Sequence, residues 1–182
     1  MKSLVVLALL TGEALAEDPP EIPRNLVATD LMFVLPVDNY ADDADLGIGF
    51  LGRGERRMGD KLSLVARLGP VFHKSNIQGG SLLMLTALGG MRYDLDPNRR
   101  SGTFFSMAIG VNHVRFAVEE GGVRASDSST SLCLDMGGGF QVRSVQVRGT
   151  IFYTPHIGAS RDGDTTSYLG LAFAIGYDIV AK

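Results

Sequence analysis

The sequence predicts an all-β protein, a single antiparallel up-and-down transmembrane β-barrel of eight strands preceded by a cleavable signal peptide. From about residue 28 onward, bulky apolar side chains alternate with small or polar ones in segments of about ten residues, which is the period of a β-strand. The connections between these segments alternate between short and long, as they do in barrels that cross a membrane. No run of eighteen or more apolar residues is present, so a membrane crossing requires a closed barrel and not a helix.

The first residues have the organisation of an export signal. Lys2 provides a positive start, an apolar run extends from Leu4 to Leu10, and Ala14-Leu15-Ala16 is a cleavage site of the small-x-small type. The alternative is that the run forms a buried N-terminal strand or helix. We expect a signal peptide at 1–16, an extended proline-containing leader at 17–27 and the barrel at 28–182.

The composition narrows the class of protein. A chain of 182 residues fits one domain. The net charge of −3 argues against a nucleic-acid partner, which needs a basic face to neutralise phosphates. Cys133 is the single cysteine, so no intrachain disulfide can form.

The clearest strand is the last one, from Tyr168 to Val180, where Leu171 and Phe173 share one face and Gly170 and Ala172 the other. The same division into a bulky apolar face and a face of small residues predicts strands at 61–73, 131–142 and 145–155. Three further segments alternate less regularly, and a first strand is needed for an even number; we expect these four strands at 28–36, 46–53, 80–93 and 102–118. Within the last of them the apolar phase changes, which we interpret as a β-bulge near Asn112 and His113.

The lengths of the connections orient the barrel. Bacterial membrane barrels have short periplasmic turns and longer outer loops. We therefore expect the periplasmic turns at 54–60, 94–101 and 143–144. The outer loops are expected at 37–45, 74–79, 119–130 and 156–167.

Alternation alone does not say which face of the sheet meets lipid. A soluble barrel of the lipocalin type turns its bulky apolar face inward, whereas a membrane barrel turns it outward. The second face of these strands consists mainly of Gly, Ala and Ser, with isolated charges of both signs. Small residues suit the narrow lumen of an eight-stranded barrel, and on a water-facing strand each glycine costs about 0.5–1 kcal/mol without benefit. The pattern favours the membrane barrel.

The inward charges predict a polar network in the lumen. Unpaired charges in so narrow a space are strongly penalised. We expect Arg148 and Asp178, on neighbouring strands, to lie at similar depth and to pair, joined by Arg67 and Asp135. The network that we predict plugs the barrel and consists of Arg67, Arg92, Asp135, Arg148 and Asp178.

Aromatic residues on the bulky face fall near the ends of the expected strands. This is the position of the two interfacial girdles of membrane barrels. The periplasmic girdle is expected to contain Phe50, Tyr93, Phe105, Phe140 and Tyr177, and the outer girdle Phe72, Phe116 and Tyr153.

Two segments share a Gly-rich pattern that ends in an aromatic residue: Leu46-Gly47-Ile48-Gly49-Phe50 and Met136-Gly137-Gly138-Gly139-Phe140. With the final Gly-rich strand, they resemble small eight-stranded bacterial outer-membrane β-barrel proteins of the OmpA/OmpX type. The resemblance covers nearly all of the chain after the signal. It implies a monomer in the outer membrane of a Gram-negative bacterium, in contact with outer-membrane lipids and lipopolysaccharide, with no cofactor.

The sequence favours a structural or surface-interaction role over catalysis. We expect no nucleic-acid partner, and the extracellular or periplasmic protein partner stays unidentified. The alternatives are a small porin-like solute channel, a soluble lipocalin-like barrel, and a lipid-modifying hydrolase. The last rests on His73-Lys74-Ser75-Asn76, which resembles the His-x-Ser-Asn stretch of outer-membrane lipid A deacylases, but it lies mid-chain and no acid in the next strand can orient the histidine.

No metal site is expected either, because the acidic loop of Asp38, Asp42, Asp43 and Asp45 lacks the spacing of a cation-binding loop.

Overall fold

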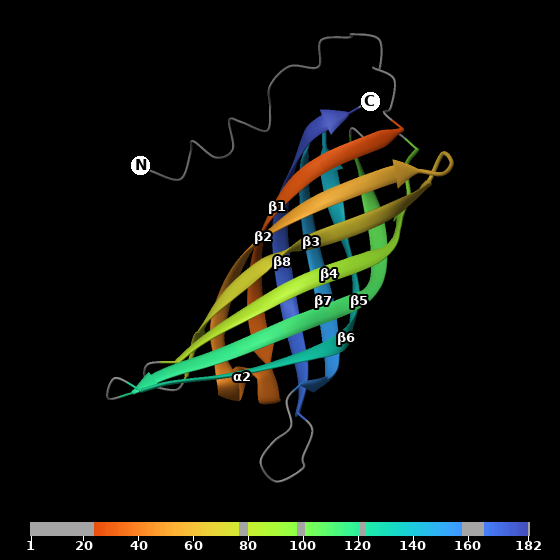
Figure 1. Cartoon of the computed structure of the whole chain (residues 1–182). Helices are drawn as coiled ribbons and strands as arrows, with labels where there is room; N and C mark the ends of the chain where they lie inside the picture. The colour runs from red at the N-terminus through yellow and green to blue at the C-terminus, as the bar shows by residue number, and fades with distance from the viewer. Residues whose placement is uncertain (1–23, 77–79, 98–100, 121–122, 158–165, 182) are drawn as a thin grey trace, which may run out of the picture.

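A computed structural model describes residues 24–76, 80–97, 101–120, 123–157 and 166–181. Eight antiparallel strands pair in chain order, and β1 pairs with β8, so the sheet closes into the predicted barrel (Figure 1). The elements are β1 (Asn25–Val37), α2 (Asn39–Asp43), β2 (Ala44–Arg57), β3 (Leu62–Ser75), β4 (Gly80–Asp94), β5 (Ser101–Glu120), β6 (Val123–Val142), β7 (Val145–Ile157) and β8 (Thr166–Ala181). No helix in the described ranges is long and apolar enough to span a membrane.

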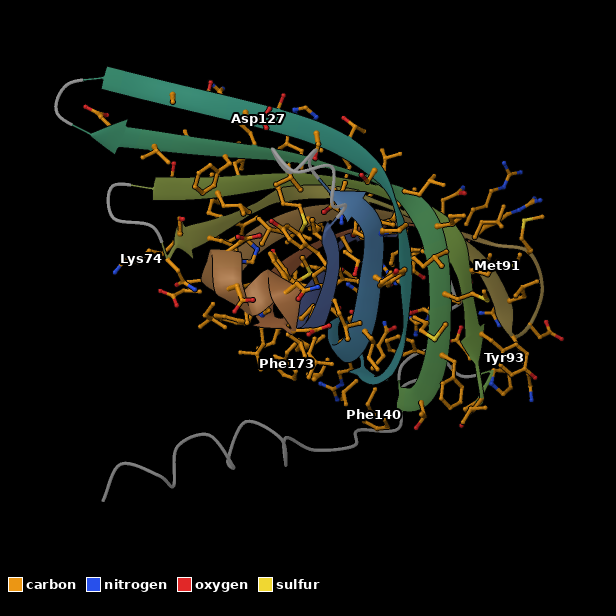
Figure 2. The ribbon with its side chains drawn as sticks, turned by 90° about the horizontal axis from the view of Figure 1, so that it is seen from below. Lys74, Met91, Tyr93, Asp127, Phe140 and Phe173 are labelled. Carbon is orange, nitrogen blue, oxygen red and sulfur yellow. The ribbon has the colours of Figure 1, made fainter. Side chains whose placement is uncertain are left out.

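The bulky face of the sheet points outward, as expected for a barrel in lipid. In β8, Leu171 and Phe173 are 44% and 47% exposed, while Ala172 and Ala174 between and after them are buried. Phe140 and Phe173 project away from the barrel wall (Figure 2). A soluble barrel would bury these side chains, so the lipocalin-like alternative is wrong.

The two ends of the barrel differ. β1 begins and β8 ends at one end, which we call the inner end, while α2 and the tip of the β5–β6 hairpin lie at the other, the outer end (Figure 1). The expected outer loop at 119–130 is almost entirely strand, because β5 and β6 are 20 residues long and pair up to Glu120 and Val123. This hairpin projects beyond the other strands (Figure 1).

The strands extend beyond their expected limits. β1 begins at Asn25 and not at Ala28, and β2 continues to Arg57 through residues that we expected in a turn. The expected signal peptide at 1–16, and the leader up to residue 23, lie outside the described residues.

The predicted bulge near Asn112 and His113 is wrong. β5 pairs in unbroken register with both β4 and β6 across this point. The apolar phase changes because Val114 is buried in the lumen and Phe116 packs against the buried apolar cluster. Phe116 therefore does not belong to the outer girdle, where we expected it. It faces the lumen, which is apolar at the outer end of the barrel.

Candidate functional site

The inner half of the lumen contains a dense charge network. Four arginines from four different strands are almost completely buried there: Arg53 of β2, Arg67 of β3, Arg92 of β4 and Arg148 of β7. The buried acids Asp30, Glu55, Asp94 and Asp135 come from β1, β2, β4 and β6. Burial of so many ions is tolerated only when they are paired and hydrogen-bonded.

Arg53 is the first centre of this network. Its Nε donates to Asp30 Oδ1 at 3.1 Å, its Nη2 to Asp178 Oδ1 at 3.0 Å, and its Nη1 to Glu55. One guanidinium thus joins β1, β2 and β8 across the closure of the barrel. Asp178 also accepts a hydrogen bond from Gln141 Nε2 at 2.8 Å, which links this cluster to β6.

Arg92 is the second centre. Its Nε donates to Asp94 Oδ1 at 2.8 Å, its Nη1 to Gln146 Oε1 at 3.0 Å and its Nη2 to Gln141 Oε1 at 2.7 Å. The guanidinium carbon lies 3.9 Å above the centre of the Phe104 ring, a cation–π arrangement. These contacts tie β4 to β6 and β7 through the lumen, so the inner half is cross-linked in several directions.

The remaining two arginines are paired unequally. Arg67 Nη1 donates to Asp135 Oδ1 at 2.8 Å; the sequence placed both residues in the lumen network but did not pair them with each other. Arg148 does not pair with Asp178: it lies opposite Ala174, four residues along β8, and its ion pair is with Asp30 at 3.7 Å. The expected equal depth was wrong because the strands are staggered. Within the described residues, Arg148 Nε and Nη1 have no hydrogen-bond partner.

Sequence reasoning missed four charged residues of this network, Asp30, Arg53, Glu55 and Asp94. Arg53 and Glu55 nevertheless alternate in phase with the inward Gly47 and Gly49 of β2. Ending the strand at Arg53 left Glu55 in a turn. Continuing the period-two pattern to the end of β2 would have found both residues.

The outer half of the lumen is filled by apolar side chains. Val34, Val71 and Met84 are almost fully buried and belong to one cluster with Phe152 and Tyr168. Between this cluster and the charge network lies a cavity of about 20 Å³, room for about one water molecule. Its lining comprises Met32, Leu51, Met84, Thr86, Leu88, Asn112, Cys133, Asp135, Arg148 and Phe152.

Helix α2 lies at the outer end of the barrel, against β8, β1 and β2. Tyr40 on this helix is fully buried, and its ring stacks on Tyr168 of β8 with a centroid separation of 4.2 Å. Burial, followed by the proximity of Tyr168 and Asp43, raises the pKa of the Tyr40 phenol above its ordinary value. The phenol therefore stays protonated and donates its hydrogen to His73 Nε2 at 2.6 Å.

His73 is held as part of this contact and is not set up as a catalytic base for Ser75. Its Nδ1 lies 2.9 Å from the backbone carbonyl of Asp45; since a carbonyl can only accept, Nδ1 carries the proton and Nε2 is the acceptor for Tyr40. A Cβ at Gly47 would overlap the imidazole ring, so glycine makes room for it. Both ring nitrogens are engaged, which argues against the deacylase-like mechanism.

The aromatic residues of the expected girdles lie mostly on the outer surface. The exposed ones are Phe50, Phe72, Tyr93, Phe105, Phe140, Tyr153 and Tyr177, and Phe116 is the exception described above. Tyr93 and Phe140 are seen at the inner end of the wall (Figure 2). Exposed aromatics at this position match residues at a lipid–water boundary.

The outer part of the β5–β6 hairpin, residues 113–120 and 123–130, forms what we call the outer ribbon. β6 pairs with β7 from Leu134 onward, and among the described residues the β7 side of 123–128 has no ladder partner; we call this side the open edge. The backbone N–H of Ser128 donates to the side chain of Asp127 at 2.7 Å, which shows that this N–H faces the open edge. Asp127 lies on the projecting part of the hairpin (Figure 2).

Solved structures of small bacterial barrels share this architecture. Ail, the attachment invasion locus protein of Yersinia pestis, has a TM-score of 0.59 at 14% identity, with 87% of this chain and 100% of that chain covered. The N-terminal β-barrel domain of Pseudomonas aeruginosa OprF has a TM-score of 0.57 at 8% identity, covering 87% and 100%. Neisserial surface protein A has a TM-score of 0.56 at 14% identity, covering 87% and 99%. No known protein family and no curated protein matches the sequence.

Fold and surface together define a class. The chain is an eight-stranded transmembrane β-barrel of the outer-membrane type. The predicted location, the bacterial outer membrane, follows from this fold and from the apolar outward face. Its likeness to OprF, Ail and Neisserial surface protein A is a likeness of fold.

Proposed function

We propose that this protein is a closed outer-membrane barrel that acts through its outer surface and does not conduct solutes. The observation that carries the proposal is the outer ribbon, a projecting pair of strands with an open edge. An open strand edge presents unpaired N–H and C=O groups and can accept a further strand from a partner protein. The lumen, which is occupied by charged and apolar side chains, supports a surface role over transport.

The plug consists of three layers in series. The charge network fills the inner half, the apolar cluster fills the outer half, and Tyr40 of α2 closes the mouth. Opening a path would require desolvated ions such as Arg53 and Arg92 to separate from their partners, which is costly in so narrow a lumen.

Conductance in planar bilayers tests the closed lumen. We expect no steady single-channel openings from the full chain. A variant with Tyr40→Ala and Met84→Ala removes two of the buried side chains that fill the outer half, and it should also stay closed because the charge network of the inner half is intact. Steady openings of the unaltered protein would support the porin-like channel and overturn the plugged lumen.

The surface role is tested by display on bacterial cells. A shortened hairpin, in which residues 116–127 are replaced by Asn-Gly, keeps the Arg115–Ser128 pair and a two-residue turn. We expect cells with this variant to adhere less to protein-coated surfaces than cells with the full hairpin. Equal adhesion would contradict the proposal.

A single substitution separates the open edge from the bulk of the hairpin. Ser128→Pro removes the N–H that faces the open edge, whereas Ser128→Ala keeps it. We expect Ser128→Pro to lower adhesion and Ser128→Ala to leave it unchanged. If the two variants adhere equally, the ribbon does not act by strand addition.

Residues 1–16 are proposed to be a signal peptide, with 17–24 as the leader that precedes β1 of the mature barrel. The basis is the sequence pattern of Lys2, the Leu4–Leu10 run and the Ala14-Leu15-Ala16 site. N-terminal sequencing of protein from an outer-membrane fraction is expected to begin at Glu17. A mature chain that retains Met1 would contradict it.

A further inference from the structure

The small cavity in the middle of the lumen has two unused hydrogen-bond donors in its wall. Arg148 lines this cavity, and its side chain is only 2% exposed. Its Nε and Nη1 have no hydrogen-bond partner among the described residues, and its ion pair with Asp30 is made by Nη2, at 3.7 Å. A buried guanidinium N–H without an acceptor is costly. A ligand that accepts two hydrogen bonds would therefore stabilise this part of the lumen.

The other polar side chains of the cavity wall do not supply that acceptor. Thr86 donates to Asn112 Oδ1 at 2.8 Å, and Asn112 Nδ2 donates to Thr154 Oγ1 at 2.9 Å. An amide nitrogen carries two hydrogens, so Asn112 can donate one further bond. Among the described residues of the wall, Asp135 is the one acid, and Arg67 already donates to it at 2.8 Å. The polar side of the cavity thus has donors in excess.

The buried charges are unevenly distributed along the lumen. Toward the inner end, Arg53 and Arg92 share four acids, Asp30, Glu55, Asp94 and Asp178. Beside the cavity the proportion is reversed, because Arg67 and Arg148 have Asp135 and only a share of Asp30. Positive charge at this level is therefore not balanced locally within the described chain. A buried charge is tolerated when an opposite charge lies beside it.

We infer that the cavity binds one monovalent anion of the size of chloride or bromide, held by Arg148 Nε and Nη1. A cavity of about 20 Å³ has room for about one water-sized ligand, which is too small for phosphate, sulfate or an organic acid. A halide only accepts hydrogen bonds, as the donors of the wall require, and it supplies the negative charge that Arg148 lacks. A water molecule fits the same space but would leave that charge unbalanced.

Crystals of the protein refolded in sodium bromide test the site. Side chains fill the lumen on both sides of the cavity, so the anion is supplied during refolding and not by soaking. Anomalous scattering at the bromine absorption edge then identifies bromide by element. We expect one peak inside the lumen, within hydrogen-bond distance of Arg148 Nε and Nη1. Density at this position without a bromine signal would be water, and bromide at surface positions only would be adventitious; either result would overturn the inference.

Two variants show whether Arg148 holds the anion. Arg148→Met removes both donors and the charge but keeps a side chain of similar length, so the bromide peak should disappear. Arg56→Met, the matched control, removes an arginine that is exposed at the inner end, and the peak should remain. A peak that persists in Arg148→Met would contradict the site. The peak in the unaltered protein depends on no variant, so the inference can fail even where Arg148→Met does not fold.

Urea unfolding in lipid vesicles measures the same site in solution. The protein is compared in sodium bromide and in sodium gluconate, whose anion is too large for the cavity, at equal ionic strength. A ligand that binds only the folded state stabilises it by mass action, and bromide at ten times its Kd raises the folding equilibrium constant about elevenfold. We expect a higher urea midpoint in bromide for the unaltered protein and for Arg56→Met, and equal midpoints in both salts for Arg148→Met. An equal gain in all three proteins would be a general salt effect and would refute the anion site.

Discussion

The two halves of the lumen are filled in different ways. The inner half contains ions, with Arg53 and Arg92 each bonded to several partners on other strands. The outer half contains apolar side chains packed around Val34, Val71 and Met84. Both halves lie within one closed sheet of eight strands, so the backbone does not dictate how the space is filled.

The difference determines how each half responds to substitution. An ion network depends on complete pairing, because removing one member leaves its partners charged and buried. Apolar packing responds in a graded way, in proportion to the volume removed. The charged half should thus be the more sensitive to the loss of one well-connected residue.

The largest effect is expected for Arg53→Met. The change leaves Asp30, Glu55 and Asp178 without their shared cation, and breaking a buried ion pair on one side costs about 3–5 kcal/mol. Urea unfolding in lipid vesicles, followed by circular dichroism, measures the free energy of unfolding. Arg56→Met, at the exposed neighbouring position, is the control and should change it by less than about 0.5 kcal/mol. Similar losses in both variants would show that the network contributes little.

A smaller loss is expected for Met84→Ala in the apolar half. Met84 is almost fully buried, and truncation of a buried methionine costs about 2–5 kcal/mol because a cavity remains. Met107, which is 63% exposed on the lipid side, provides the matched control: lipid tails fill the space left by Met107→Ala, so its loss should be clearly smaller. The same unfolding experiment compares the two. If Met107→Ala proves the more costly, the outer half is not a packed core.

The closure of the mouth should depend more weakly on a single hydrogen bond. Tyr40→Phe keeps the ring stacked on Tyr168 but removes the O–H that donates to His73, at a cost of about 1 kcal/mol. Hydrogen exchange of the backbone amides of α2 measures local opening directly. We expect faster exchange there, while Tyr153→Phe on the lipid-facing side leaves it unchanged. Unaltered exchange in Tyr40→Phe would mean that stacking alone holds α2.

The sequence predicted the barrel, its strand number and its orientation toward lipid because period-two alternation reports directly on which face is buried. It placed Arg67 and Asp135 in the lumen for the same reason, since both residues fall on the inward face. It failed for Arg148 and Asp178 because the depth of a residue depends on the stagger between strands, which alternation does not encode. It also missed the apolar outer half of the lumen. The apolar residues Val114 and Phe116 were interpreted as the result of a β-bulge, whereas they face inward and pack in the lumen.

The smallest effect is expected for Arg148→Met, and it tests how the charged half is organised. Arg148 is as buried as Arg53, yet its only ion pair among the described residues is the 3.7 Å contact with Asp30, and two of its nitrogens lack partners. Asp30 keeps Arg53 as its closer partner at 3.1 Å. A methionine of similar length avoids the desolvation cost of the guanidinium, and such replacements of buried ions are often neutral or stabilising. We expect the free energy of unfolding to stay within about 1 kcal/mol of the unaltered protein, in contrast to Arg53→Met. A loss as large as that of Arg53→Met would mean that Arg148 is an equal member of the network, and that the stability of the inner half follows the number of buried charges and not the quality of their pairing.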